Sequence, residues 1–180
     1  LFSFNCLALA GAERSLHSPP EYRWMMAKSP LMYGGQLPIT DKVTLNLVTN
    51  ELALLINSHS SNDMQVAYQG DCSCRQKSGF ACHPRNPPGA TPCVATWWSS
   101  LGKCKAVAVL NVGAATAPDV EVAYEQIDLP SNTGYSVTEV YKKKWLVTPD
   151  PEAFKVSVPG MGGTLLIVSP VGTEAAQCVV

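Results

Sequence analysis

Fourteen acidic side chains are the first candidates for chemistry in this sequence. Two carboxyl groups that face one bond can act as nucleophile and acid, or as acid and base. Asp41 and Glu51 instead fit the first turns of helices, where negative charge is stabilising. Most of the others fall in expected turns or on polar strand faces, so we assign no catalytic residue. The acidic residues are Glu13, Glu21, Asp41, Glu51, Asp63, Asp71, Asp119, Glu121, Glu125, Asp128, Glu139, Asp150, Glu152 and Glu174.

Other catalytic patterns are missing from the sequence. Ser29 and Ser58 are not framed by the G-x-S-x-G elbow that exposes a nucleophilic serine. The glycines at 34–35 and 160–163 lack the context of a phosphate-binding or dinucleotide-binding loop. Substrate-binding residues therefore stay unassigned, and no metal ligands are expected.

Seven cysteines form the second chemical signal. Four of them crowd a polar segment at 70–93 that is rich in Gly and Pro, and we take these as disulfide candidates: Cys72, Cys74, Cys82 and Cys93. Disulfides persist in oxidising compartments and stabilise segments that have little core of their own. We therefore expect a secreted or extracellular protein, with the cell wall or the vacuole as alternative locations. The pairing cannot be read from the sequence.

Zinc is the alternative explanation for Cys72, Cys74 and Cys82, with His83 as a further ligand. The C-x-C spacing at Cys72 differs from the paired C-x-x-C knuckles of structural zinc sites, so disulfides are preferred. An odd number of cysteines leaves one thiol free or paired outside this sequence. Cys6 and Cys178, near the two ends, are the candidates for that thiol.

The elements that would position these side chains change type along the chain. Over 22–60 the pattern predicts a helix, a short buried strand at 31–33, a loop and two further helices. Thr40 is expected to cap the first of those two, with Asp41 in its first turn, and Asn50 to cap the second. Their buried residues should include Leu47, Leu52, Leu55 and Ile56.

The same stretch resembles the end of the α/β barrel in the α-galactosidase (melibiase) family of glycoside hydrolases. The resemblance is to its plant α-galactosidase-like and β-L-arabinopyranosidase-like members. It rests on W-x-x-A-K-S-P-L-M-Y-G-G from Trp24 and T-x-N-L-V-T-N-E-L-x-x-x-I-N-S from Thr44. It implies that residues 1–62 hold the last strand and flanking helices of a truncated TIM barrel. Within them, residues 1–20 match nothing expected there.

From Cys93 onward the hydrophobic period is that of strands. Short alternating strands between turn signals predict an antiparallel β-sandwich over 63–180, with the cysteine-rich loop at 70–93. Residues 66–68 add an early strand. The other expected strands are 94–99, 105–112, 120–127, 135–141, 154–158 and 164–168. The predicted fold class is thus α/β plus all-β.

This half also resembles the melibiase family, in which an antiparallel β domain follows the barrel. The matching segments are W-W-S-S-L-G-K-C-K-A-V-A-V-L-N-V from Trp97, V-T-E-V-Y-K-K-K-W-L from Val137 and F-K-V-S-V-P-G-M-G-G-T-L-L-I-V-S-P from Phe154. One departure is visible in the last hairpin, where the family commonly has a His before its Gly and this chain has Met161.

Aromatic side chains at 97, 98, 141 and 145 could stack on a sugar. Neighbouring residues of a strand point to opposite faces, however, so Trp97 and Trp98 cannot form one platform. Large aromatic side chains also fill the space between packed layers. We therefore expect these residues to pack inside the protein.

Length and charge exclude several classes. The chain has 180 residues, whereas a complete eight-fold barrel needs about 250. Its net charge is −1 and it has no basic block, which argues against a nucleic-acid partner. No apolar run is long enough to span a membrane.

The resemblance implies a fragment of a retaining glycoside hydrolase that acts on terminal α-D-galactosides or β-L-arabinopyranosides. A carbohydrate would be the partner of the full-length enzyme, and no metal or organic cofactor is implied. Both catalytic groups of that family are aspartates on earlier barrel strands, and no motif here matches them, so the fragment alone should be inactive. The alternative is a non-catalytic carbohydrate-binding or scaffolding β-sandwich module.

Overall fold

A computed structural model of the chain describes residues 26, 37–70, 92–111, 113, 115–142, 144–145 and 150–179. Their helices are α2 (Lys42–Val48) and α3 (Glu51–His59), with short 3₁₀ helices η1 (Leu37–Ile39), η3 (Tyr124–Ile127) and η4 (Ala175–Gln177). The strands are β1 (Ser61–Gly70), β2 (Cys93–Leu101), β3 (Cys104–Asn111), β4 (Ala117–Ala123), β5 (Tyr135–Glu139), β6 (Lys144–Trp145), β7 (Ala153–Val158) and β8 (Gly162–Pro170). The predicted strand at 31–33 and most of the predicted helix before it lie outside the described residues.

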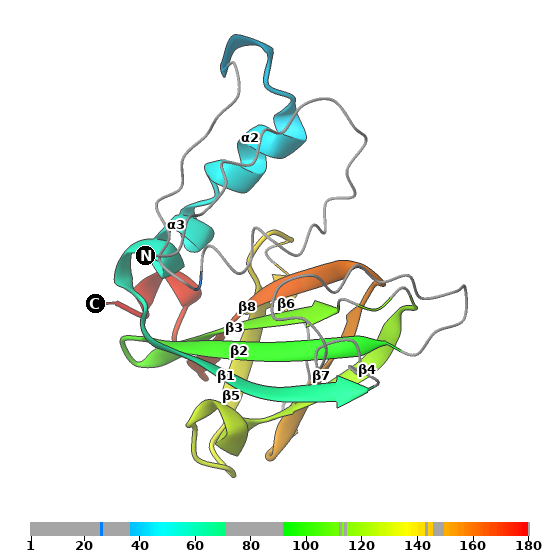
Figure 1. Cartoon of the computed structure of the whole chain (residues 1–180). Helices are drawn as coiled ribbons and strands as arrows, with labels where there is room; N and C mark the ends of the chain where they lie inside the picture. Colours follow the sequence, from blue (N-terminus) through cyan, green and yellow to red (C-terminus); the bar gives the residue numbers. More distant parts are fainter. Residues whose placement is uncertain are drawn as a thin grey trace, which may run out of the picture.

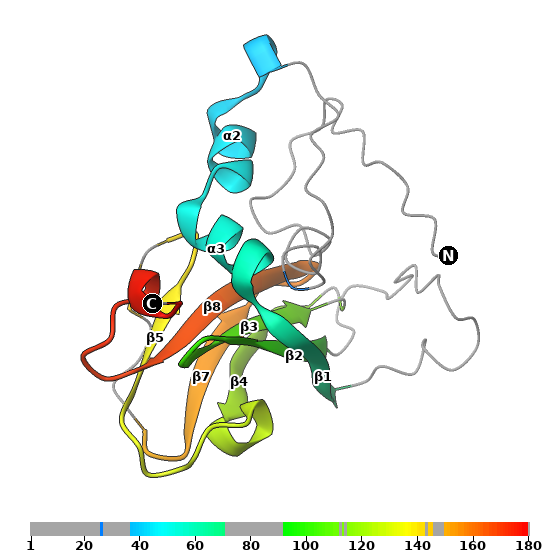
Figure 2. The same ribbon diagram turned by 90° about the vertical axis from the view of Figure 1, so that its left-hand side faces the viewer.

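The strands form two antiparallel layers, as the sequence predicts. The larger sheet has the order β1-β2-β3-β8-β5-β6, and the smaller one pairs β4 with β7. Figures 1 and 2 show β4 and β7 on one side of the larger sheet and α3 on its other side. The larger sheet is therefore the central layer of the described residues.

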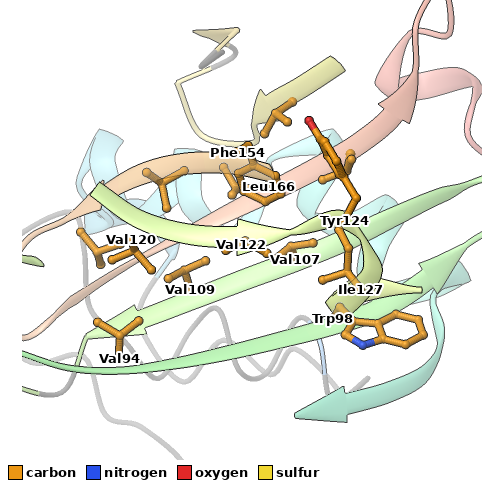
Figure 3. Packing of buried hydrophobic residues seen from close by; sticks show 14 of the residues in the cluster. Val94, Trp98, Val107, Val109, Val120, Val122, Tyr124, Ile127, Phe154 and Leu166 are labelled. Carbon is orange, nitrogen blue, oxygen red and sulfur yellow. The ribbon is translucent and has the colours of Figure 1, made fainter. Parts of the chain in front are cut away.

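The main core lies between the two sheets. Alternate residues of β3 and β8, such as Val107 and Leu166, point to the smaller sheet and pack against Val122 and Phe154 (Figure 3). Tyr124, which follows β4, closes this core and is fully buried. The period-two alternation of apolar residues in β4 and β7 matches this one-sided burial.

A second core covers the opposite face of the larger sheet. Ala53 and Ile56 of α3 pack there against the other alternate residues of the two central strands, which include Ala108 and Ile167. Both central strands are thus buried on both faces, which explains their nearly continuous apolar sequences.

One predicted strand is partly wrong. Residues 124–127 form the 3₁₀ helix η3 and do not extend β4. Tyr124 and Ile127 are buried while the two residues between them are exposed, and a spacing of three is the period of a 3₁₀ helix. Asp128 then ends the turn in the left-handed region, with a φ of 58°.

Of the two predicted helix N-caps, one is confirmed and the other is wrong. Asn50 caps α3, because its Oδ1 accepts a hydrogen bond of 3.0 Å from Ala53 N. The cap of α2 is Asp41 and not Thr40, since Asp41 Oδ1 accepts from Thr44 N at 2.8 Å and its Oδ2 accepts from the Thr44 hydroxyl at 2.7 Å. Asp41 lies three residues before Thr44, the spacing that this capping bond needs.

Burial on the helices is less extensive than the sequence predicts. Ile56 is fully buried, as expected. Leu47, Leu52 and Leu55 are only half-buried. Among the described residues, none of the helices has the length and hydropathy needed to cross a membrane.

Candidate functional site

Several acidic side chains of the described residues serve as caps. Asp41 caps α2, and Asp150 Oδ1 accepts a hydrogen bond of 2.9 Å from Glu152 N in the turn before β7. Glu174 forms a reciprocal capping box with Gln177 around η4. These carboxylates satisfy main-chain N–H groups that would otherwise be left without a partner.

Three further carboxylates pair with lysines. Asp128 lies 2.8 Å from Lys105, Glu139 lies 3.0 Å from Lys142, and Glu121 lies 3.4 Å from Lys155, in each case from a carboxylate oxygen to Nζ. The part of the chain that the structure describes holds no group of three or more His, Cys, Asp or Glu side chains that could bind a metal. Neither the caps nor these pairs place two carboxyl groups on one bond, as a retaining glycosidase requires.

Lys105 is the most enclosed of these lysines, with 8% of its surface exposed. Its Nζ lies 2.8 Å from Asp128 Oδ2, 3.3 Å from Ser100 Oγ and 4.1 Å from the centroid of the Trp98 ring. An ammonium group has three N–H donors, and these three neighbours can accept all of them. The cluster therefore ties β3 to the end of η3, and Lys105 is not placed to act as a nucleophile.

Ser58 and His59 have the geometry of a nucleophile and its base, with 2.7 Å between Oγ and Nδ1. The single proton of the hydroxyl, however, is directed to the main-chain oxygen of Leu54, which is also 2.7 Å away. His59 Nδ1 must then donate to Ser58 Oγ and cannot accept its proton. The pair closes the last turn of α3, in keeping with the missing sequence motif around Ser58.

Tyr124 carries a buried hydroxyl with no hydrogen-bond partner among the described residues. Burial raises its pKa above the ordinary value of about 10, and the nearby Asp150 carboxylate and Tyr135 raise it further. Its ring lies 4.6 Å from that of Tyr135 and 5.9 Å from that of Phe154, measured between centroids. The hydroxyl therefore stays neutral at physiological pH, and the residue serves packing.

The aromatic side chains at 97, 98 and 141 pack as the sequence predicts, and the structure does not describe the side chain of Trp145. Trp98 lies in the core between the sheets (Figure 3), whereas Trp97 packs against the core under α3. Tyr141 also packs against the core under α3 and is half-buried. Trp97 and Trp98 thus point to opposite faces of β2 and do not form one sugar-stacking surface.

The cysteines give one correction. Cys178 is not a free thiol, because it forms a disulfide with Cys104 across a sequence separation of 74 residues. Cys93 is disulfide-bonded as well, as predicted. The remaining candidates, Cys72, Cys74, Cys82, Cys6 and His83, lie outside the described residues.

Comparison with known proteins finds the same fold in parts of glycosidases of known structure. The chain matches no protein-family model and no curated protein sequence. Among solved structures it is similar to a GH27 β-L-arabinopyranosidase from Geobacillus stearothermophilus, with 21% identity and a TM-score of 0.67 over 87% of this chain and 30% of that one. It is also similar to α-galactosidase I from Mortierella vinacea, with 17% identity and a TM-score of 0.66 over 93% of this chain and 39% of that one.

A variant of the Geobacillus enzyme has been solved with arabinose, and it matches this chain with a TM-score of 0.66. The chain spans about a third of the length of these structures. The predicted resemblance to the α-galactosidase family is thus confirmed at the level of the fold.

Proposed function

We propose that this chain is the C-terminal part of a retaining glycoside hydrolase that acts on terminal α-D-galactosides or β-L-arabinopyranosides. The observation that carries the proposal is the shared fold with two glycosidases, described for these two kinds of sugar, over 87% and 93% of the chain. The sandwich would then be an accessory domain, and α2 and α3 would belong to the end of an α/β barrel.

The helices support the second half of this proposal. Figure 2 shows α2 extending away from the sheets, whereas α3 packs on the larger one. Ile39, Leu45 and Leu54 are large apolar side chains of this helical region that remain exposed, Ile39 to 77%. A helix that exposes apolar residues in this way has the sequence of one that packs against a further layer.

The acidic residues support the absence of activity in this chain alone. Barrel enzymes gather their catalytic groups from the ends of several strands, and the carboxylates described above are engaged as caps or as partners of lysine. The full enzyme would take its nucleophile and acid from barrel strands beyond this sequence. The isolated chain should therefore bind no substrate productively.

The test has two arms. Purified Leu1–Val180 is assayed at mildly acidic pH with a chromogenic α-galactoside and a chromogenic β-L-arabinopyranoside, with a heat-denatured sample as control. We expect no turnover. The coding sequence upstream of Leu1 in the parent transcript should encode the remaining barrel strands, and the protein extended by them should hydrolyse one of the two substrates.

Two results would overturn this proposal. Turnover by the isolated chain that is lost on changing a single Asp or Glu would place an active site here. An upstream sequence with no barrel, together with galactoside binding by the isolated chain in calorimetry, would favour a carbohydrate-binding module. The packing of Trp97 and Trp98 on opposite sides of one sheet argues against that module.

We further propose that the protein matures in an oxidising compartment and is secreted. The disulfide between Cys104 and Cys178 and the disulfide-bonded state of Cys93 support this. Mass spectrometry of the natural protein, alkylated before reduction, tests it. Free thiols at these three positions would contradict the proposal.

A further inference from the structure

The C-terminal segment, residues 171–179, lies beside α3 on the outer face of the larger sheet. Its 3₁₀ helix η4 is in contact with α3 and with β8. Figures 1 and 2 both show this segment, drawn in red, next to the base of α3. The end of the chain therefore forms part of the surface on which α3 packs.

Among the described residues, few noncovalent contacts hold this segment. Cys178 is its one fully buried side chain, Ala175 and Val179 are half-buried, and Val171 is exposed. The polar contacts to the sheet include a hydrogen bond of 3.2 Å from Lys103 N to the main-chain oxygen of Cys178. So little apolar burial stabilises a nine-residue segment only weakly against its conformational entropy. The covalent bond to Cys104 is thus its main anchor.

The disulfide is also part of the surface that α3 contacts. Cys104 and Cys178 belong to the same buried cluster as Ala53 and Ile56, the two fully buried side chains of α3. Loss of the bond would free the segment and open one side of this cluster to water. The packing of α3 on the larger sheet is in this way linked to the oxidation state of Cys104 and Cys178.

We propose that the disulfide between Cys104 and Cys178 is a redox clasp, which keeps α3 docked on the sandwich while it is oxidised and releases α3 and residues 171–179 when it is reduced. Under the function proposed above, α3 leads from this domain to the barrel. Reduction would then loosen the link between the two domains without unfolding the sandwich.

The chemistry requires a reductant, and a small dithiol is sufficient. Its thiolate attacks one cysteine sulfur, the S–S bond breaks, and a mixed disulfide forms with the other cysteine released as a thiolate. The second thiol of the reductant then displaces the first cysteine and closes a cyclic disulfide. Two electrons and, after protonation, two protons pass to Cys104 and Cys178. Both residues are at most 1% exposed, so the segment must open before the attack.

The first experiment removes the bond by mutation. Hydrogen exchange is measured on the whole chain, on the double variant Cys104→Ala with Cys178→Ala, and on Leu166→Ala as the matched control. Leu166 is fully buried on the other face of β8, in the core between the two sheets, so its truncation destabilises the sandwich but leaves the disulfide and the surface under α3 unchanged. We expect amides of α3 and of residues 174–179 to exchange at least tenfold faster in the double variant relative to those of β3 and β8. The control should not show this selective change.

The second experiment keeps the natural sequence, and it decides the matter if the double variant does not fold. Folded protein is incubated with dithiothreitol, quenched with an alkylating agent and mapped by mass spectrometry, with hydrogen exchange in parallel. We expect alkylation of Cys104 and Cys178 to appear together with the loss of protection in α3. Alkylation of both cysteines with α3 still protected, or equal protection of α3 in the oxidised protein and the double variant, would overturn the proposal.

Discussion

The side-chain amide of Asn50 donates a hydrogen bond of 3.2 Å to the main-chain oxygen of Val140, ninety residues further along the chain. The Oδ1 atom of the same side chain caps α3, and the main-chain N–H of Val140 donates to Leu165 in β8. One amide thus fixes both where α3 begins and how that beginning lies against the end of β5.

Replacing Asn50 should therefore cost more than the loss of an ordinary cap. We expect Asn50→Ala to lower the free energy of unfolding by about 1.5–3 kcal/mol, the sum of a cap and a partly buried hydrogen bond. Asp41→Ala is the matched control, because Asp41 caps α2 in an exposed position. Its loss should reduce helix content but cost at most about 1 kcal/mol. Equal effects in urea denaturation would show that the contact with Val140 contributes nothing.

Neighbouring positions on α3 should differ in their response to truncation. Ile56 is fully buried against the sheet, so Ile56→Ala should cost about 2–5 kcal/mol, as other core truncations do. Leu55 is half-buried, and Leu55→Ala should cost about 1–2 kcal/mol because less apolar surface is removed from the core. Denaturant unfolding of both variants measures the difference. A larger loss for Leu55 would mean that α3 is docked by a different face.

The sequence predicts the sandwich well because each strand carries its own signal. Period-two alternation marks β4 and β7, and unbroken apolar runs mark the central strands that are buried on both faces. The same local patterns predict a strand at 124–127, which is wrong, because the spacing of three between the buried Tyr124 and Ile127 is that of a 3₁₀ helix. The sequence also predicts more burial for Leu47 and Leu55 than the structure shows, because an apolar residue on a helix does not indicate whether the layer that covers it is in the same chain.

The contacts between distant parts of the chain could not be predicted. The pairing of Cys104 with Cys178 depends on the path of residues 171–179 past α3, and no local pattern encodes that path. The pairing of Lys105 with Asp128 depends likewise on the turn after η3. The lack of a known catalytic motif is read directly from the sequence, because motifs are local, and the inactivity of this chain alone stays a prediction.

Tyr124 should make the protein sensitive to alkali. Its pKa is raised in the folded state, so above about pH 10 the unfolded chain loses this proton while the folded one keeps it. The contribution of Tyr124 to the free energy of unfolding is fully present below about pH 10. Above that pH it falls by up to about 1.4 kcal/mol per pH unit, until the pH reaches the pKa of Tyr124 in the folded state. Tyr124→Phe should remove this part of the decline. Below pH 9 the variant should be as stable as the natural protein or up to about 1 kcal/mol more stable, because it lacks a buried hydroxyl that has no hydrogen-bond partner among the described residues.

Unfolding curves of both proteins between pH 8 and pH 11 check this prediction, and the other tyrosines cancel in the comparison. A parallel decline of the two curves would show that Tyr124 ionises as easily in the folded protein as in the unfolded one. A large loss of stability in Tyr124→Phe at neutral pH would show that the hydroxyl has a hydrogen-bond partner after all.

Alanine substitutions at Gly102 and Gly172 should differ in how much they destabilise the protein, because only Gly102 lies against other atoms of the chain. Gly102 and Gly172 both have positive φ, 56° and 84°, so alanine is strained at either position, by about 1–2 kcal/mol. At Gly172 an added Cβ would meet no atom within 4 Å, whereas at Gly102 it would overlap the main-chain oxygen of Cys178. Gly102→Ala must therefore also push the C-terminal segment off the β2–β3 hairpin and break the hydrogen bond from Lys103. We expect Gly102→Ala to be clearly the more destabilised variant in thermal unfolding, and to show faster hydrogen exchange at residues 174–179. Equal effects of the two substitutions would mean that residues 171–179 can move away from Gly102 without loss of stability. That result would contradict the anchoring of this segment by the disulfide to Cys104.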